Sequence, residues 1–67
     1  MTLTTVFDVQ QLLKRFGIFV YVGDRATNLD MMELEIRDLY QSQLIDSIEY
    51  QTAILLLRRE IGEEKQK

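Results

Sequence analysis

Two aromatic residues, Phe19 and Tyr21, stand two positions apart in the apolar stretch G-I-F-V-Y-V-G. Basic residues flank this stretch, with Lys14 and Arg15 before it and Arg25 after it. Aromatic rings stack on nucleobases, and lysine and arginine hold phosphates, so this combination is typical of proteins that bind single-stranded nucleic acid. These residue types therefore predict a binding site rather than a catalytic one.

The residue types needed for catalysis are scarce. The chain contains neither His nor Cys, which removes the usual general base, the thiolate nucleophile and the commonest metal ligands. Its two serines, Ser42 and Ser47, have no base to activate them, and paired acids such as Asp30 and Glu33 are ordinary on a solvated helix face. There is no glycine-rich phosphate loop and no calcium-loop spacing. We therefore expect no enzymatic activity, no cofactor and no metal.

The composition fits one small globular domain. The 67 residues are 46% apolar and 28% charged, which is too hydrophobic for a disordered chain. The net charge of −3 argues mildly against a dedicated nucleic-acid binder unless the cations are clustered. The start, M-T-L-T-T, lacks the pattern of a signal peptide, and the longest apolar runs fall far short of the roughly 20 residues of a membrane span. We expect a soluble cytoplasmic protein without membrane contact.

Apolar residues at helical spacing predict a first helix over about residues 5–16. Thr5 is a plausible N-cap, and Asp8 three residues later completes a capping box. Gly17 is well placed as the left-handed residue that ends the helix. The predicted buried stripe consists of Val6, Val9, Leu12, Leu13 and Phe16.

A second helix is predicted over about residues 28–42. Its start stays open, because Thr27 with Asp30, Asn28, or Asp24 after a glycine could each cap it. The predicted buried stripe consists of Leu29, Met32, Ile36 and Leu39, with Tyr40 beside it.

A third helix begins after Asp46, which is expected to cap it in a box with Glu49, while Ile45 packs on Tyr50. Gly62 is expected to end it, followed by a frayed polar tail. The predicted buried stripe consists of Tyr50, Ala53, Ile54, Leu57 and Ile61. Three amphipathic helices must bury their apolar faces against one another, which predicts an all-α fold: a compact antiparallel three-helix bundle in a single domain over residues 1–67.

The link between the first two helices is expected to span about a dozen residues, against the roughly 2–8 that are usual in bundles. If it is extended, Ile18, Val20 and Val22 lie on one face, and Phe19 and Tyr21 on the other. Three interpretations are open. Both sets are buried and form a hydrophobic lid; or the link is an unpaired strand edge that meets its own copy in a homodimer; or the two aromatic residues form a stacking platform for bases.

The expected topology brings the basic residues together. In an up-down-up bundle, the end of the first helix, the start of the second and the end of the third lie at the same pole. Cations near helix C-termini also stabilise the helix dipole without any ligand, so this clustering has a structural explanation as well. The candidate nucleic-acid-binding residues are Lys14, Arg15, Phe19, Tyr21, Arg25, Arg58 and Arg59.

Several segments carry a family resemblance. They are F-D-V-Q-Q-L-L-K-R-F-G at 7–17, G-D-R at 23–25, E-I-R-D-L-Y at 35–40, L-I-D at 44–46 and L-R-R-E at 57–60. In this order they resemble the YqgQ-like family of short proteins from Gram-positive bacteria of the Bacillus type. The resemblance implies a small cytoplasmic three-helix bundle, with single-stranded nucleic-acid binding suggested and no catalytic residues. The matched positions of interest are Lys14, Gly17, Gly23, Asp24, Arg25, Arg58 and Arg59.

The leading hypothesis is a small non-enzymatic module that binds single-stranded RNA or DNA with little sequence preference. The competing hypothesis is a protein–protein interaction module, either a homodimer through residues 17–23 or an adaptor for another protein. A third hypothesis is a structural accessory subunit whose basic residues only cap helices.

Overall fold

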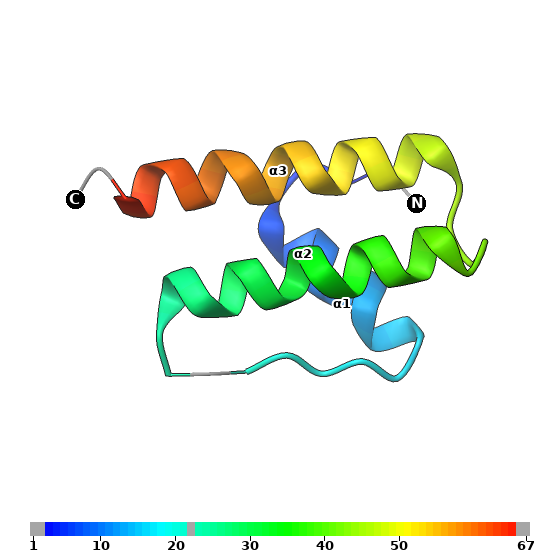
Figure 1. Ribbon diagram of the computed structural model, residues 1–67, viewed down its shortest axis with the longest axis horizontal. Helices are drawn as coiled ribbons and strands as arrows, with labels where there is room; N and C mark the ends of the chain where they lie inside the picture. The colour runs from blue at the N-terminus through cyan, green and yellow to red at the C-terminus, as the bar shows by residue number, and fades with distance from the viewer. Residues whose placement is uncertain (1–2, 22, 66–67) are drawn as a thin grey trace.

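Three helices form an all-α bundle, as the sequence predicts (Figure 1). The computed structural model describes residues 3–21 and 23–65, and for residues 64 and 65 the backbone alone. The helices are α1 (Val6–Arg15), α2 (Arg25–Gln41) and α3 (Ser47–Lys65), and no strand occurs within these described ranges. Figure 1 shows α2 and α3 side by side and antiparallel, with the shorter α1 crossing behind them at an angle. The helical hairpin of α2 and α3 is therefore the frame on which the remaining chain packs.

The starts of α1 and α3 are fixed by capping boxes, as predicted. The backbone N–H of Asp8 donates to the Thr5 hydroxyl at 3.2 Å, and the Thr5 N–H donates back to the Asp8 carboxylate at 3.1 Å. At α3, the Glu49 N–H donates to the Asp46 carboxylate at 2.7 Å, and the Asp46 N–H to Glu49 at 3.3 Å. Each box gives partners to backbone N–H groups that the helix itself leaves unpaired.

The start of α2 lies three residues before the predicted Asn28. Of the three caps that the sequence left open, the structure uses Asp24. Its carboxylate accepts both the backbone N–H and the hydroxyl of Thr27, at 2.9 and 2.8 Å. Because one carboxylate accepts both groups of Thr27, the helix can begin at Arg25. The link from α1 is consequently residues 16–24, shorter than the dozen expected.

A backbone motif around Gly17 ends α1. Gly17 has a φ of 76°, its N–H donates to the Lys14 carbonyl at 2.9 Å, and the following N–H of Ile18 donates to Leu13 at 3.0 Å. This pattern of bonds is a Schellman motif, and it requires the left-handed backbone that glycine adopts at least cost. α3 differs from the prediction: it continues through Gly62 to Lys65, because Gly62 does not take that left-handed conformation.

The core lies where all three helices meet, and the extended link adds one residue to it. The predicted stripes are largely confirmed, although Phe16 is 37% exposed because it caps the end of α1 rather than continuing the stripe. Val6, Tyr50 and Ile61 are packed against the core but only partly buried. The buried residues are Leu3, Val9, Leu12, Leu13, Val20, Leu29, Met32, Ile36, Leu39, Ile45, Ala53, Ile54 and Leu57.

The α2–α3 hairpin is held at both ends by side chains outside this core. Near the turn, the rings of Tyr40 and Tyr50 stack with centroids 4.3 Å apart and an interplanar angle of 7°. At the other end, Arg25 at the start of α2 pairs with Glu60 near the end of α3, at 3.5 Å. The ring stack is the stronger of the two, because exposed ion pairs contribute little.

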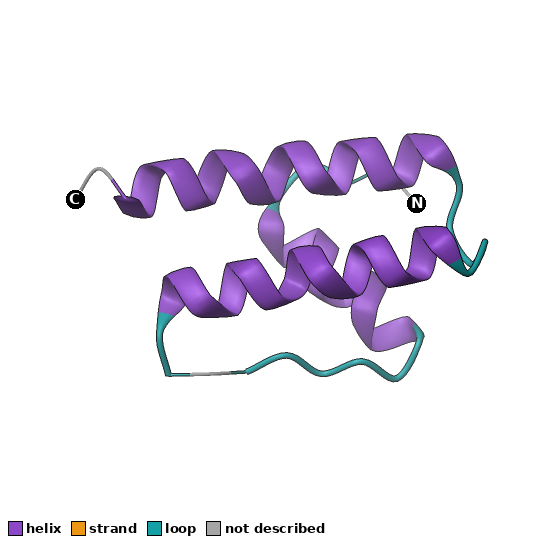
Figure 2. Ribbon diagram, in the orientation of Figure 1, coloured by secondary structure: helices purple, strands orange, loops and turns teal. Residues whose placement is uncertain are grey.

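The direction of the link decides where the site lies. Figures 1 and 2 show it leaving the end of α1 and running back alongside α2 as a drawn-out loop to the start of that helix. α1 thus ends toward the α2–α3 turn, whereas α2 begins at the opposite end of the molecule (Figure 1). The start of α2 and the end of α3 share a pole, as expected, but the end of α1 lies toward the opposite pole, because the link runs back alongside α2 (Figure 1).

Candidate functional site

Residues 18–21, here called the extended segment, alternate between buried and exposed side chains. Val20 is buried and Ile18 packs against the core, whereas Phe19 is 74% exposed and Tyr21 90% exposed. Successive side chains of an extended chain point to opposite sides, so filling the core with one pair turns the other pair outward. The interpretation of a lid with both sets buried is therefore wrong for the two aromatic residues. Val22, assigned to the inner face by the sequence, lies outside the described residues.

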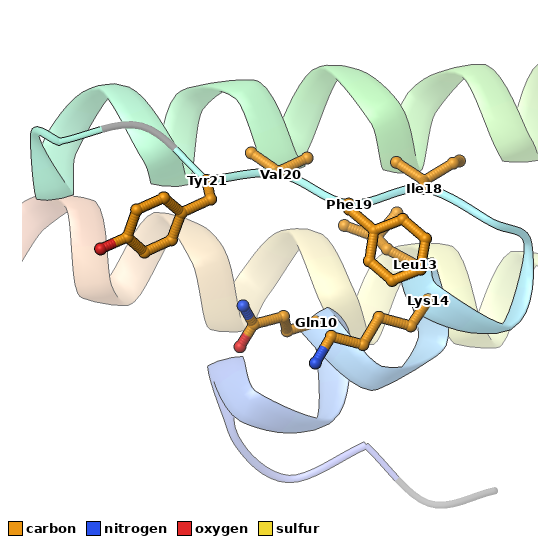
Figure 3. Close-up of a pocket in the computed structure, with 7 residues that line it drawn as sticks. All are labelled: Gln10, Leu13, Lys14, Ile18, Phe19, Val20 and Tyr21. Atoms are coloured by element: carbon orange, nitrogen blue, oxygen red, sulfur yellow. The ribbon is translucent and has the colours of Figure 1, made fainter.

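A groove of about 190 Å³ lies between the extended segment and α1 (Figure 3). Apolar side chains of α1 and the segment form most of its lining. Figure 3 shows Phe19 and Tyr21 apart, on either side of Val20, with the head groups of Gln10 and Lys14 of α1 across from the gap between them. The lining residues are Gln10, Leu13, Lys14, Ile18, Phe19, Val20 and Tyr21.

The sequence around the groove contains cations and no carboxylate. All eleven acidic residues of the chain lie outside residues 9–23, and this stretch includes Lys14 and Arg15. The local charge is therefore positive in a protein whose net charge is −3. An anionic ligand meets less repulsion here than over the carboxylate-bearing faces of α2 and α3.

The other described cations are already paired with carboxylates. The ion pairs are Arg25–Glu60 at 3.5 Å, Arg37–Glu33 at 3.0 Å, Arg58–Glu33 at 3.6 Å and Arg59–Glu63 at 3.9 Å. Within the described part of the chain, Lys14 and Arg15 take part in no ion pair. Lys14, the cation that lines the groove with the exposed rings, is thus one of the two left without a described carboxylate.

Comparison with known proteins gives the chain a family. A model of the YqgQ-like family matches residues 3–63. The chain belongs to the YqgQ-like family. A relative from Bacillus subtilis (strain 168), the uncharacterized protein YqgQ, is 40% identical over 63 residues, covering 94% of this chain and 89% of the relative. No solved structure gives a significant match. The resemblance carried by the sequence segments is therefore confirmed.

The seven residues predicted to bind nucleic acid fall into two groups in the YqgQ-like chain. Lys14, Phe19 and Tyr21 line the groove, and Arg15 follows at the end of α1. The remaining three arginines lie on α2 and α3, where each is ion-paired: Arg25, Arg58 and Arg59. Five cations therefore do not converge at one pole. The up-down-up topology that predicted this convergence omitted the return path of the link.

Sequence reasoning missed Gln10, which contributes the other polar head in the groove. The signal was present, because Gln10 and Lys14 are four residues apart and lie on the same face of α1. It could be found only after the extended segment had been placed against that face.

The shifted pKa values of this YqgQ-like chain belong to helix caps outside the groove. Hydrogen bonds from the hydroxyl and N–H of Thr4 hold the pKa of Asp8 below its usual value. The N–H and hydroxyl of Thr27 lower the pKa of Asp24 in the same way. Both shifts come from hydrogen bonds to the ionised form, which is the expected effect of capping rather than a sign of catalysis.

The described side chains include no group of three or more carboxylates placed to hold a metal ion. No helix in the described ranges is long and apolar enough to cross a membrane.

Proposed function

We propose that this chain is a cytoplasmic, non-enzymatic module that binds single-stranded nucleic acid through the groove between α1 and the extended segment. One observation carries the proposal. The two most exposed aromatic rings of the described chain, Phe19 and Tyr21, share the groove with Lys14, and neither Lys14 nor its neighbour Arg15 is paired with a described carboxylate. The rings would stack on bases, and the cations would hold phosphates.

The chemistry of the groove predicts weak sequence preference. Every base has a face that can stack on an aromatic ring, and a lysine ammonium holds any phosphate. Each stacked base contributes about 1–3 kcal/mol, and each phosphate contact on a single strand adds about 0.7 to the slope of log affinity against log salt. Two rings and one or two cations therefore predict modest, salt-sensitive binding.

The proposed contact surface is narrower than the seven residues suggested by the sequence. Arg25 and Arg58 would have to break their ion pairs with Glu60 and Glu33 before holding a phosphate. The start of α2, where Arg25 lies, is also at the opposite end of the molecule from the end of α1 (Figure 1). We therefore assign them to holding α2 and α3 together.

Titration of a labelled single-stranded oligonucleotide, followed by fluorescence anisotropy at two salt concentrations, tests the proposal. Phe19→Ala and Tyr21→Ala should each weaken binding by about 5- to 150-fold. Leu55→Ala is the matched control, because Leu55 is an apolar side chain on α3, 69% exposed and outside the groove. No binding at low salt, or equal affinities of the ring variants and the control, would contradict the proposal.

A second candidate function is self-association through the extended segment, and one observation favours it. The backbone N–H and C=O groups of Phe19, Val20 and Tyr21 make no hydrogen bond to any described residue. Such an unpaired edge is a template for another extended chain, including a second copy. Sedimentation equilibrium separates the two candidates, since a monomer mass that does not change with concentration excludes the homodimer.

A further inference from the structure

The geometry of the groove points to the size and state of the ligand. We infer that it takes a two-nucleotide step of an unstacked single strand, with one base on Phe19, the next on Tyr21 and the phosphate between them at Lys14. This inference rests on the proposed function and specifies its ligand.

The spacing of the two rings fits successive bases that have separated from each other. Residues two apart in an extended chain are about 6.6 Å apart, whereas stacked bases follow each other at about 3.4 Å. This is the spacing of the Cα atoms that carry the rings, so neighbouring bases can each cover one ring only if the strand is stretched well beyond its stacked rise. A duplex holds its bases stacked and paired, so it has no free base face to offer Phe19 or Tyr21.

The orientation of the rings favours two bases over one. Figure 3 shows the rings of Phe19 and Tyr21 apart from each other, on either side of Val20, rather than facing each other across the gap. A single base inserted between the rings would need them to face each other. As they stand, each ring offers one open face to one base, consistent with exposures of 74% and 90%.

The volume and polarity of the groove fit the linkage between the bases. At about 190 Å³ the groove is smaller than the roughly 300–1,000 Å³ of pockets that enclose whole small molecules. Its polar side chains, Gln10 and Lys14, lie across from the gap between the rings (Figure 3). The Lys14 ammonium can hold the linking phosphate, and the Gln10 amide can donate to a phosphate or sugar oxygen.

Titrations followed by amide chemical shifts in NMR test this inference on the full chain. The ligands are a mononucleotide, a dinucleotide, the same dinucleotide with an uncharged methylphosphonate linkage, and a hexanucleotide in single-stranded and duplex form. We expect the dinucleotide to bind about 5- to 150-fold more tightly than the mononucleotide, because it gains the second stacking contact. We expect the duplex to bind far more weakly than the single strand.

The variants locate the linking phosphate. The methylphosphonate linkage should weaken binding to the wild-type chain but make no difference to Lys14→Ala, which has already lost the contact. Arg25→Ala is the charge-matched control, because it removes one positive charge at the far end of the hairpin and should respond to the neutral linkage as the wild type does.

The outcomes separate this inference from the proposed function. If the single-stranded hexanucleotide shifts the groove amides but mononucleotide and dinucleotide bind equally, the two-nucleotide step is overturned and the proposed function stands. If the methylphosphonate linkage weakens binding to Lys14→Ala as much as it weakens binding to the wild type, the assignment of the linking phosphate to Lys14 is overturned. If no oligonucleotide shifts any amide between residues 10 and 21, the inference and the proposed function both fail.

Discussion

Leu55 and Leu57 in α3 offer a matched test of the packing, because they are two residues apart and lie in opposite environments. Leu57 is 0% exposed and belongs to the core, whereas Leu55 is 69% exposed. Truncating a leucine to alanine removes three carbon atoms, worth about 2.4 kcal/mol at about 0.8 kcal/mol per buried methylene. The cavity left at Leu57 raises its cost to about 3 kcal/mol, within the roughly 2–5 kcal/mol measured for such changes.

The same truncation at the exposed position should be nearly neutral. Leu55 has less than a third of its surface buried, so the transfer term falls to about 0.7 kcal/mol. The slightly higher helix propensity of alanine offsets part of this cost. We therefore expect Leu55→Ala to change the free energy of unfolding by less than about 0.5 kcal/mol.

Urea denaturation followed by far-ultraviolet circular dichroism measures both changes. A chain of 67 residues is expected to have a total stability of about 3–10 kcal/mol. Leu57→Ala should therefore remove between a third and all of it, lowering the urea midpoint while the slope of the transition is retained. Equal losses for the two variants, or a loss below about 1 kcal/mol for Leu57→Ala, would refute this account of the core.

Two further predictions concern backbone and caps. Gly17→Ala should destabilise the fold by about 1–2 kcal/mol, since the φ of 76° is strained for alanine. Gly62→Ala should stabilise it by up to about 1 kcal/mol, since Gly62 lies within a helix and a Cβ there meets no atom within 4 Å. The two variants should therefore shift the urea midpoint in opposite directions, and shifts in the same direction would contradict the prediction. The hydrogen bonds from Thr27 lower the folded-state pKa of Asp24, so its stabilising effect is present above about pH 4 and lost as the pH falls through the lower folded value. Asp24→Asn keeps an acceptor for the cap without a titrating charge, so its urea midpoint should fall less steeply toward low pH than that of the wild type, and parallel curves would argue against the cap as the cause.

Local signals in the sequence predicted the helices well. A helix start depends on a few neighbouring residues, and both Thr5 with Asp8 and Asp46 with Glu49 form the boxes that their spacing indicates. The start of α2 was less certain, because several capping residues stand close together. Only the two hydrogen bonds from Thr27 to Asp24 decide between them.

The path of the link could not be read from the sequence. Its alternating pattern predicts that Phe19 and Tyr21 share a face, and they do, but the pattern does not say which side of the bundle the link follows. That choice depends on where Ile18 and Val20 find apolar surface, and this surface is formed by residues far away in the sequence. The convergence of cations was predicted from an up-down-up topology, and it failed for Lys14 and Arg15 because the link runs back alongside α2 and leaves the end of α1 toward the opposite pole.

Stability does not account for the two exposed rings. A domain of this size buries only about 60% of the surface of its unfolded chain, so every apolar side chain left in water is a stabilising contact forgone. Among the described residues of the extended segment, Ile18 and Val20 pack against the core, whereas Phe19 and Tyr21 are largely exposed. Phe19 and Tyr21 instead lie open beside Lys14, in the stretch of the chain that has no carboxylate. We propose that a ligand covers these rings, one that is flat enough to stack on them and carries the negative charge that the groove lacks.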